Sequence, residues 1–192
     1  MSFTVRFFTV SYLFSVTSLF FLLVMKESTS EIMLRGIDPM LTPELLHAMR
    51  SAGHGDAFVV CDCNFPATSV AKSTTLGAPI LLAGAQADAA LDAICALLPV
   101  DLFEETPICH MAPAKGDSMP PEGAAGIKKC CEVFQVRSPS APPPAPVDRF
   151  AFYELAKKAF VVIQCTGERR PYVNFIIKKG VIGPDGNDLK PR

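Results

Sequence analysis

Residues 149–180, RFAFYELAKKAFVVIQCTGERRPYVNFIIKKG, predict a helix, a buried strand, a polar turn and a second strand. Apolar side chains recur at helical spacing in the first part, at Phe152, Leu155 and Ala156. The run AFVVI over residues 159–163 is continuous, apolar and rich in β-branched side chains, which is typical of a strand covered on both faces. This succession of elements predicts an α/β fold.

The second strand of this segment is predicted to begin at Tyr172, after a turn over residues 166–171 that contains Gly and Pro. Alternation along a strand would place Tyr172 and Asn174 on the same face. A phenol beside a carboxamide can bind the hydroxyl groups of a ligand. An edge strand with a solvated outer face is the alternative, and the residue pattern leaves both open.

The composition narrows the class of protein. A chain of 192 residues predicts one domain with a sizeable core, and a net charge of −1 argues against nucleic acid or an anionic membrane surface as a partner. Seven cysteines lie within apolar runs, which favours reduced, mostly buried thiols and a cytoplasmic location over a disulfide framework. The sequence contains no phosphate-binding glycine motif and no zinc-ligand spacing, so we expect no cofactor and no metal.

The first 32 residues are interpreted as a hydrophobic extension of a domain over residues 33–192. Residues 7–24 carry no charge and reach the lower length limit of a membrane span, but they also resemble a signal peptide. A third interpretation is an upstream segment that is not always translated. Membrane contact is expected only if residues 7–24 are retained as an anchor.

The stretch that follows Met33 contains the first candidate site residues. Residues 57–61, AFVVC, predict a buried strand, and Asp62 comes directly after it. Ligands of open α/β sheets bind beyond the carboxyl ends of strands, which makes Asp62 a candidate binding residue, and a turn-forming or N-capping aspartate fits the pattern equally well. His54 lies in a loop between two glycines and is either a surface side chain or a proton-transfer group, since its ordinary pKa is about 6.5.

The middle of the chain, residues 88–146, shows weaker patterns. A helix is predicted near Asp88, a strand around residues 108–111, a short helix over residues 127–135 and a proline-rich surface loop over residues 138–146.

Two blocks of this sequence resemble the signatures of the L-fucose mutarotase family, whose relatives include D-ribose pyranase. RFAFYELAKKAF…TGERRPYVNFIIKKGV resembles the C-terminal signature, and LRGIDPMLTPELLHAMRSAGHGDAFVVCDCNFP over residues 34–66 resembles the N-terminal one. The resemblance implies a single α/β domain, a layered sheet with helices packed on both faces. It also implies interconversion of the α and β anomers of L-fucose without a cofactor, in homo-oligomeric rings with sites near subunit boundaries.

The resemblance assigns roles to individual residues. His54 matches the family's catalytic histidine, and Asp62, Arg149, Tyr172 and Asn174 match its sugar-binding residues. Opening a sugar ring requires a proton on the ring oxygen and removal of another from the anomeric hydroxyl, which is general acid–base chemistry.

One departure from the family pattern is Val173, which stands where the family has the glycine of Tyr-Gly-Asn. We expect this side chain to narrow the pocket or to shift the substrate preference. Three alternatives therefore remain: a pyranase acting on ribose, a non-catalytic monosaccharide-binding module, and a membrane-tethered interaction protein.

Overall fold

The computed structural model describes residues 34–191. They belong to two units, the first ending at Pro39 and the second beginning at Met40. The described part of the first unit is a turn in which the Ile37 N–H donates to the Leu34 carbonyl at 3.3 Å. The predicted hydrophobic segment over residues 7–24 lies outside the described residues.

The second unit is built on a six-stranded mixed sheet with the strand order β2-β5-β1-β6-β3-β4. Strand β6 runs antiparallel to its neighbours β1 and β3, whereas every other pairing is parallel. The carboxyl ends of β1 to β5 and the amino end of β6 therefore share one edge of the sheet. The strands are β1 (Ala57–Cys61), β2 (Ile80–Leu82), β3 (Ile108–Ala112), β4 (Ala145–Asp148), β5 (Val161–Cys165) and β6 (Phe175–Lys178).

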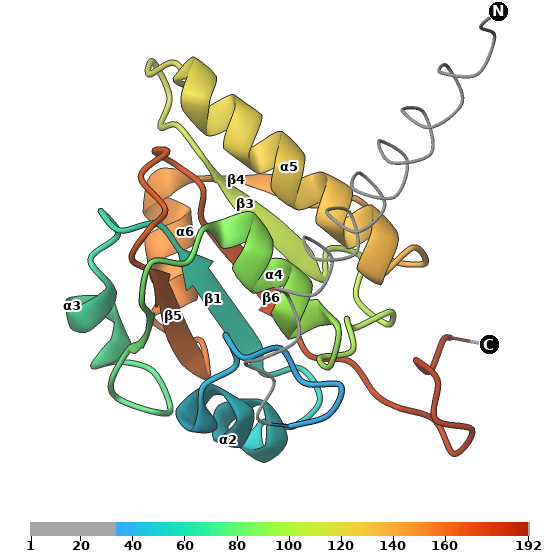
Figure 1. The fold of residues 1–192 in the computed structure, drawn as a ribbon. Helices are drawn as coiled ribbons and strands as arrows, with labels where there is room; N and C mark the ends of the chain where they lie inside the picture. Colours follow the sequence, from blue (N-terminus) through green and yellow to red (C-terminus); the bar gives the residue numbers. More distant parts are fainter. Residues whose placement is uncertain (1–33, 192) are drawn as a thin grey trace, which may run out of the picture. The chain divides into compact units, whose positions relative to one another are not determined.

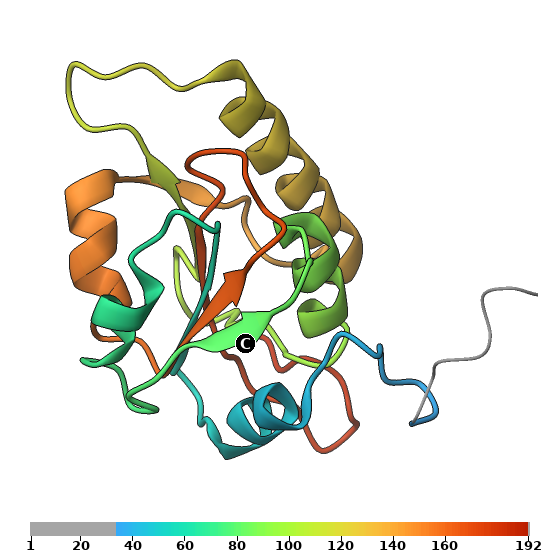
Figure 2. The same ribbon diagram turned by 60° about the vertical axis from the view of Figure 1, so that its left-hand side comes forward.

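Helices cover both faces of this sheet, as the sequence predicted (Figures 1 and 2). Helices α3 and α6 lie on one face, and α4 and α5 lie side by side on the other. Helix α2 lies at the end of the sheet where β1 begins. The helices are α2 (Pro43–Ser51), α3 (Ala67–Ala71), α4 (Ala87–Cys95), α5 (Pro121–Arg137) and α6 (Arg149–Ala156).

Apolar side chains fill both interfaces between the sheet and the helices. On the α3/α6 face, Phe152 of α6 packs edge-on against Phe65, with ring centroids 6.1 Å apart. On the other face, Phe134 of α5 packs against Phe175 of β6 at 5.6 Å. Because both faces are covered, β1 is a nearly continuous apolar run, as expected for a central strand.

Several predicted elements are confirmed in place. Strand β1 occupies residues 57–61, and α2 begins where Thr42 caps it by accepting the Leu45 N–H at 3.3 Å. Strand β5 begins two residues later than predicted, at Val161. The predicted loop over residues 138–146 ends early, because Ala145 and Pro146 belong to the edge strand β4, where proline's missing N–H is tolerated.

The prediction that Tyr172 begins the last strand is wrong. Strand β6 begins at Phe175, and Tyr172 adopts the left-handed backbone conformation with φ of 67°. The Asn174 N–H donates back to the Tyr172 carbonyl at 2.8 Å, which closes a tight turn. Alternation along a strand therefore does not decide where Tyr172 and Asn174 point.

The seven cysteines are free thiols, and five of them are buried. Burial raises the pKa of the Cys95 and Cys165 thiols to about 12, so these side chains act as small apolar groups. Within residues 34–191, no helix combines the length and the apolar character that crossing a membrane requires.

Candidate active site

Four of the five predicted site residues meet at the edge of the sheet where β1, β3 and β4 end and β6 begins. They line a hollow of about 200 Å³, smaller than the cavities of roughly 300–1,000 Å³ that hold drug-sized ligands. The hollow is lined by Asp62, Asn64, Phe65, Met111, Arg149, Tyr153, Pro171, Tyr172 and Asn174. Its size and its mixture of rings and polar groups suit a small polyhydroxylated molecule.

Asp62 and Asn174 form the buried floor of this hollow, each with at most 3% of its surface exposed. The Asn174 Nδ2 donates to Asp62 Oδ2, and the Asp62 backbone N–H donates to Asn174 Oδ1, both at 2.9 Å. Because the two residues lie 112 positions apart, this reciprocal pair fastens the turn before β6 to the end of β1.

The second carboxylate oxygen of Asp62 has a structural task. Oδ1 accepts the backbone N–H groups of Asn64 at 2.9 Å and Phe65 at 3.0 Å, which shapes the turn after β1. Burial raises the pKa of Asp62, although these hydrogen bonds and the one from Asn174 oppose the rise. Asp62 therefore has the turn-forming role, one of the two that the sequence leaves open, and its Oδ2 retains acceptor capacity for a ligand.

Val173 does not narrow the hollow, contrary to expectation. The side chain is fully buried and packs against Gly126 of α5, on the far side of the turn from the hollow. The left-handed turn at Tyr172 directs alternate side chains in this way, with Tyr172 and Asn174 lining the hollow.

Helix α6 presents two further side chains to the hollow. Asp148 caps its first turn by accepting the Phe150 N–H at 2.9 Å, which places Arg149 at the end of β4. The Arg149 guanidinium lies 3.9 Å from Asp117 and is one-third exposed. Tyr153 follows one helical turn later on the same face, a position that sequence reasoning missed although its spacing of four from Arg149 indicates it.

His54 is not part of this hollow within one chain. It precedes β1, whereas Asp62 follows it, and the five-residue strand alone separates them by about 13 Å, at roughly 3.3 Å per residue. Two backbone hydrogen bonds to Lys179, the residue after β6, fix the loop that carries His54. The Gly55 N–H donates to the Lys179 carbonyl at 2.8 Å, and the Lys179 N–H donates to the Asp56 carbonyl at 2.9 Å.

At the opposite edge, His54 pairs with Asp101, a residue that sequence reasoning missed. His54 Nε2 lies 3.0 Å from Oδ2 of Asp101, whose side chain is only 2% exposed while that of His54 is 51% exposed. The other carboxylate oxygen accepts the Phe103 N–H at 3.0 Å, and the Phe103 ring packs edge-on against His54 at 5.9 Å. A buried carboxylate that holds one ring nitrogen leaves the other available for proton transfer.

A larger hollow of about 520 Å³ lies beside His54 and is mainly apolar, with Leu46, Met49, Leu97 and Ile182 among its lining residues. Leu97 and Ile182 are exposed, at 44% and 50%. A mainly apolar surface beside His54 is unsuited to holding a sugar by itself.

The two edges offer complementary chemistry. The Asp62 edge offers a carboxylate, a carboxamide, a guanidinium and two phenols, which are groups able to hydrogen-bond hydroxyls, and the His54 edge offers an imidazole beside a buried carboxylate. Among residues 34–191, no three His, Cys, Asp or Glu side chains are grouped so that they could hold a metal ion.

Comparison with known proteins identifies relatives over most of the chain. Residues 35–182 match the RbsD / FucU transport protein family. The fucose mutarotase of Danio rerio is 40% identical over 159 residues, which cover 80% of this chain and 97% of that protein. The L-fucose mutarotase of Actinobacillus pleuropneumoniae serotype 5b is 39% identical over 157 residues, covering 78% and 97% respectively.

The fold is also shared with a solved structure that contains a sugar. The crystal structure of the fucose mutarotase from Streptococcus pneumoniae in complex with L-fucose matches with a TM-score of 0.64 and 30% identity. The match covers 78% of this chain and all of that one.

Proposed function

This chain belongs to the RbsD/FucU family, and on that premise we propose that it is a fucose mutarotase, an isomerase that interconverts the α and β anomers of L-fucose. Relatives named as fucose mutarotases are about 40% identical over most of the chain. The reaction needs proton transfer and positioning, and no redox or group-transfer step.

The observation that carries this proposal is the hollow at the Asp62 edge. Its floor is the buried Asp62–Asn174 pair, and Arg149, Tyr153 and Tyr172 line the rest. A sugar hydroxyl can donate to Asp62 Oδ2 and accept from Asn174 Nδ2, whose other contact is Met111 Sδ at 3.6 Å. A site of this kind rejects molecules that lack the matching hydroxyls, because its buried polar groups would then be left unpaired.

His54 is the proposed acid–base group, and its place in the fold requires a second copy of the chain. An imidazole cannot span the length of β1, so the His54 of one copy must approach the hollow of another. The His54 imidazole is exposed, and so are Leu97 and Ile182 on the apolar surface around it. Such an exposed apolar surface is typical of a face that contacts another subunit. A closed ring, of which a twofold dimer is the smallest case, lets every copy give and receive in this way.

In such a shared site, each residue has a definite task. The imidazole, oriented by Asp101, delivers a proton to the ring oxygen or removes one from the anomeric hydroxyl, and the remaining hydroxyls are held by the Asp62 edge. General acid–base assistance contributes about 10²–10⁴-fold, and positioning adds to it. Anomer exchange already proceeds slowly in water, so this assistance is sufficient.

Saturation transfer between the anomeric proton signals of L-fucose tests the proposal directly, with D-ribose run in parallel. We expect the full-length chain to accelerate exchange of L-fucose in proportion to its concentration. Acceleration with D-ribose alone would assign a pyranase instead. Binding of L-fucose by calorimetry without acceleration would identify a non-catalytic binding module.

A further inference from the structure

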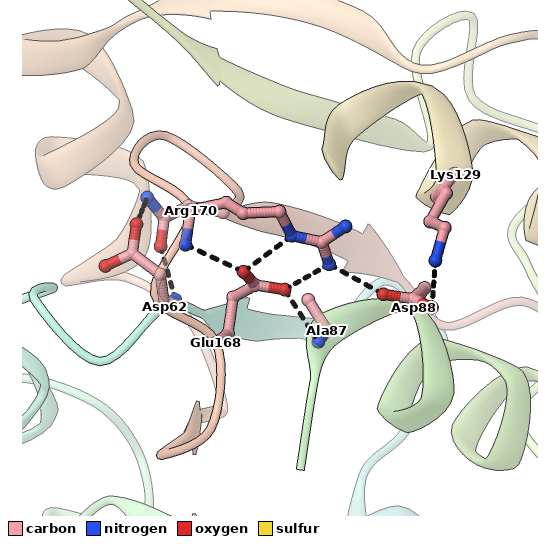
Figure 3. A network of polar contacts seen from close by, with 7 residues as sticks. Asp62, Ala87, Asp88, Lys129, Glu168 and Arg170 are labelled. Carbon is pink, nitrogen blue, oxygen red and sulfur yellow. Dashed lines mark hydrogen bonds and ion pairs between the residues drawn. The ribbon is translucent and has the colours of Figure 1, made fainter. Parts of the chain in front are cut away.

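Glu168 is a buried carboxylate whose position in the turn after β5 the proposed reaction does not explain. It is 1% exposed and accepts the Arg170 backbone N–H at 2.9 Å, the Arg170 Nε at 2.8 Å and the Ala87 N–H at 3.1 Å (Figure 3). Ala87 is the first residue of α4, so Glu168 joins the turn to the start of that helix.

Arg170 extends this network to a second carboxylate. Its Nη2 donates to Glu168 Oε2 and also to Asp88 Oδ1 at 2.7 Å, and Lys129 of α5 lies 3.9 Å from Asp88 (Figure 3). Two carboxylates face two cations, which balances the charge of this partly buried group. Arg170 is only 21% exposed and reaches α4 directly and α5 through Asp88.

The electrostatics agree with a network that stays ionised. Burial by itself would raise the pKa of Glu168, but the hydrogen bonds from Arg170 and from Ala87 outweigh it, so the pKa lies below its usual value. The bonds to Glu168 and Asp88 raise the pKa of Arg170 despite its partial burial.

Helix α5 is shaped to receive the same turn. A Cβ atom at Gly126 would lie 2.6 Å from Cγ2 of Val173 and 3.0 Å from Nε of Arg170. A Cβ at Gly123, one helical turn earlier, would overlap the carbonyl oxygen of Pro171. The turn therefore rests on bare backbone of α5, and Arg170 is held from the side by Glu168 and Asp88.

Tyr172 lies between two fixed points of this turn. Arg170 is anchored two residues before it, and Asn174 is anchored to Asp62 two residues after it. Among the described residues, Tyr172 is the only non-glycine residue with a positive φ, a conformation that persists only where the surroundings enforce it. Tyr172 lines the hollow, whereas Arg170 does not.

We propose that Arg170, clamped between Glu168 and Asp88 over the Gly123–Gly126 face of α5, is a positioning residue that fixes the Tyr172 phenol at the sugar-binding hollow. The inference rests on the proposed function of that hollow. Arg170 acts only through the turn, so loss of its side chain misplaces Tyr172 and weakens sugar binding without removing a group that touches the sugar.

The test compares Arg170→Ala, Arg170→Lys and the control Arg137→Ala in the full-length chain. Arg137 donates through the same two atoms, Nε and Nη2, to Asp92 at 2.6 and 2.7 Å, but this pair is exposed on α4 and α5, outside the hollow. We expect Arg170→Ala to raise the KM for L-fucose about tenfold and to speed amide hydrogen exchange over residues 172–174. Arg170→Lys should recover part of the KM, and Arg137→Ala should change neither.

The outcomes separate the two claims. A wild-type chain that does not accelerate anomer exchange overturns the proposed function, and the positioning role with it, in the wild-type measurement alone. With an active wild type, a folded Arg170→Ala chain of unchanged KM overturns the positioning role, even if hydrogen exchange in the turn is faster, because the network would then be merely structural.

A second pair of variants tests the contact between the turn and α5 without removing a charged group. Gly126→Ala introduces a Cβ against Cγ2 of Val173, and it should raise the KM several-fold by lifting the turn. Val173→Ala removes that Cγ2 atom, so the double variant should return part of the affinity, while the contacts of the new Cβ with Nε and Cδ of Arg170, at 3.0 and 3.2 Å, remain. A double variant as impaired as Gly126→Ala alone would contradict the proposed seating of the turn on α5.

Discussion

Asn174 and Asp62 exchange two hydrogen bonds of 2.9 Å, one from side chain to side chain and one from backbone to side chain. Both residues are almost fully buried at the end of β1. The pair closes the sheet edge between β1 and β6 and at the same time presents a carboxylate oxygen and an amide to the hollow. Two of the four atoms that hold the pair together, Asp62 Oδ2 and Asn174 Nδ2, are therefore also the atoms proposed to bind the sugar.

Asn174→Ala should lower the free energy of unfolding by about 1–3 kcal/mol, because it leaves a buried carboxylate oxygen and a buried N–H unpaired. Urea unfolding measures this loss. Asn187→Ala is the matched control, since Asn187 also donates to an aspartate, Asp185, but lies in an exposed turn, where a change within about 0.5 kcal/mol is expected. Equal losses in both variants would contradict the importance of the buried pair.

Asp101→Asn should reduce the rate of anomer exchange about 10²-fold while the KM for L-fucose stays nearly constant. The carboxamide no longer favours the imidazole orientation that the buried carboxylate imposes at 3.0 Å. Asp92→Asn, an exposed carboxylate on α4, serves as the control and should be fully active. A rate for Asp101→Asn equal to that of the wild type would show that His54 does not depend on Asp101.

Arg149→Ala and Asp117→Asn should move the KM for L-fucose in opposite directions. Removing the guanidinium takes one hydroxyl-binding group from the hollow, and we expect the KM to rise about tenfold. Removing the Asp117 carboxylate, 3.9 Å away, frees Arg149 from a weak, half-exposed ion pair, and the KM should fall by at most about fivefold. A several-fold rise for Asp117→Asn would indicate instead that Asp117 itself binds the sugar.

The pH dependence of stability should reveal the buried Glu168. Its folded-state pKa lies below the ordinary value of 4.5, so its contribution to stability is present above about pH 4.5 and is lost as the pH falls through the lower, folded-state pKa. The pH dependence of the Asp62 contribution is opposite. Because the folded-state pKa of Asp62 is raised, its contribution to stability is largest below about pH 3.8, its ordinary pKa, and is lost as the pH rises through the folded-state pKa.

Arg170→Ala tests the Glu168 contribution together with the ion pair that Arg170 makes with Asp88. At pH 7 the variant should lose about 3 kcal/mol, as expected when one partner of a buried pair is removed, and at pH 3 the loss should shrink. Arg137→Ala, whose pair is exposed, should lose less than about 1 kcal/mol at either pH. Urea unfolding at the two pH values measures these losses of unfolding free energy. A loss for Arg170→Ala that does not shrink at pH 3 would contradict the ionised state of Glu168.

The sequence predicts most of the helices and strands because each contains a clear local pattern. The unbroken apolar run of β1 and the Thr42-Pro43 start of α2 each contain their own evidence, and both are found where predicted. Helix α5 begins at Pro121, earlier than predicted, because glycines at positions 123 and 126 weaken the helical pattern. These glycines are needed for close contact with the turn before β6, which the local sequence does not reveal.

The sequence predicts four side chains that line the hollow, but it does not predict how they are arranged in space or that His54 lies apart from them. Eight positions separate His54 from Asp62, and this proximity in sequence hides their placement at opposite ends of a strand. The local pattern around Tyr172 and Asn174 predicts a strand. It gives no sign that the Asn174 side chain is hydrogen-bonded to Asp62, far away in the sequence. Asp101 has no local pattern either, and only its contact with His54, 47 positions away, reveals it.

The central claim is that one site takes His54 from one copy of the chain and the sugar-binding edge from another. The most direct measurement is anomer exchange of L-fucose by mixed oligomers, made by co-expressing His54→Ala and Arg149→Ala chains with different tags. At L-fucose concentrations well below the KM, His54→Ala alone should be nearly inactive and Arg149→Ala alone should keep about a tenth of the wild-type rate. In random one-to-one oligomers, about a quarter of the sites would combine an intact His54 with an intact Arg149, and activity should recover to about that fraction. Isolated mixed oligomers no more active than Arg149→Ala alone, or a wild-type monomer with full activity, would contradict the shared site.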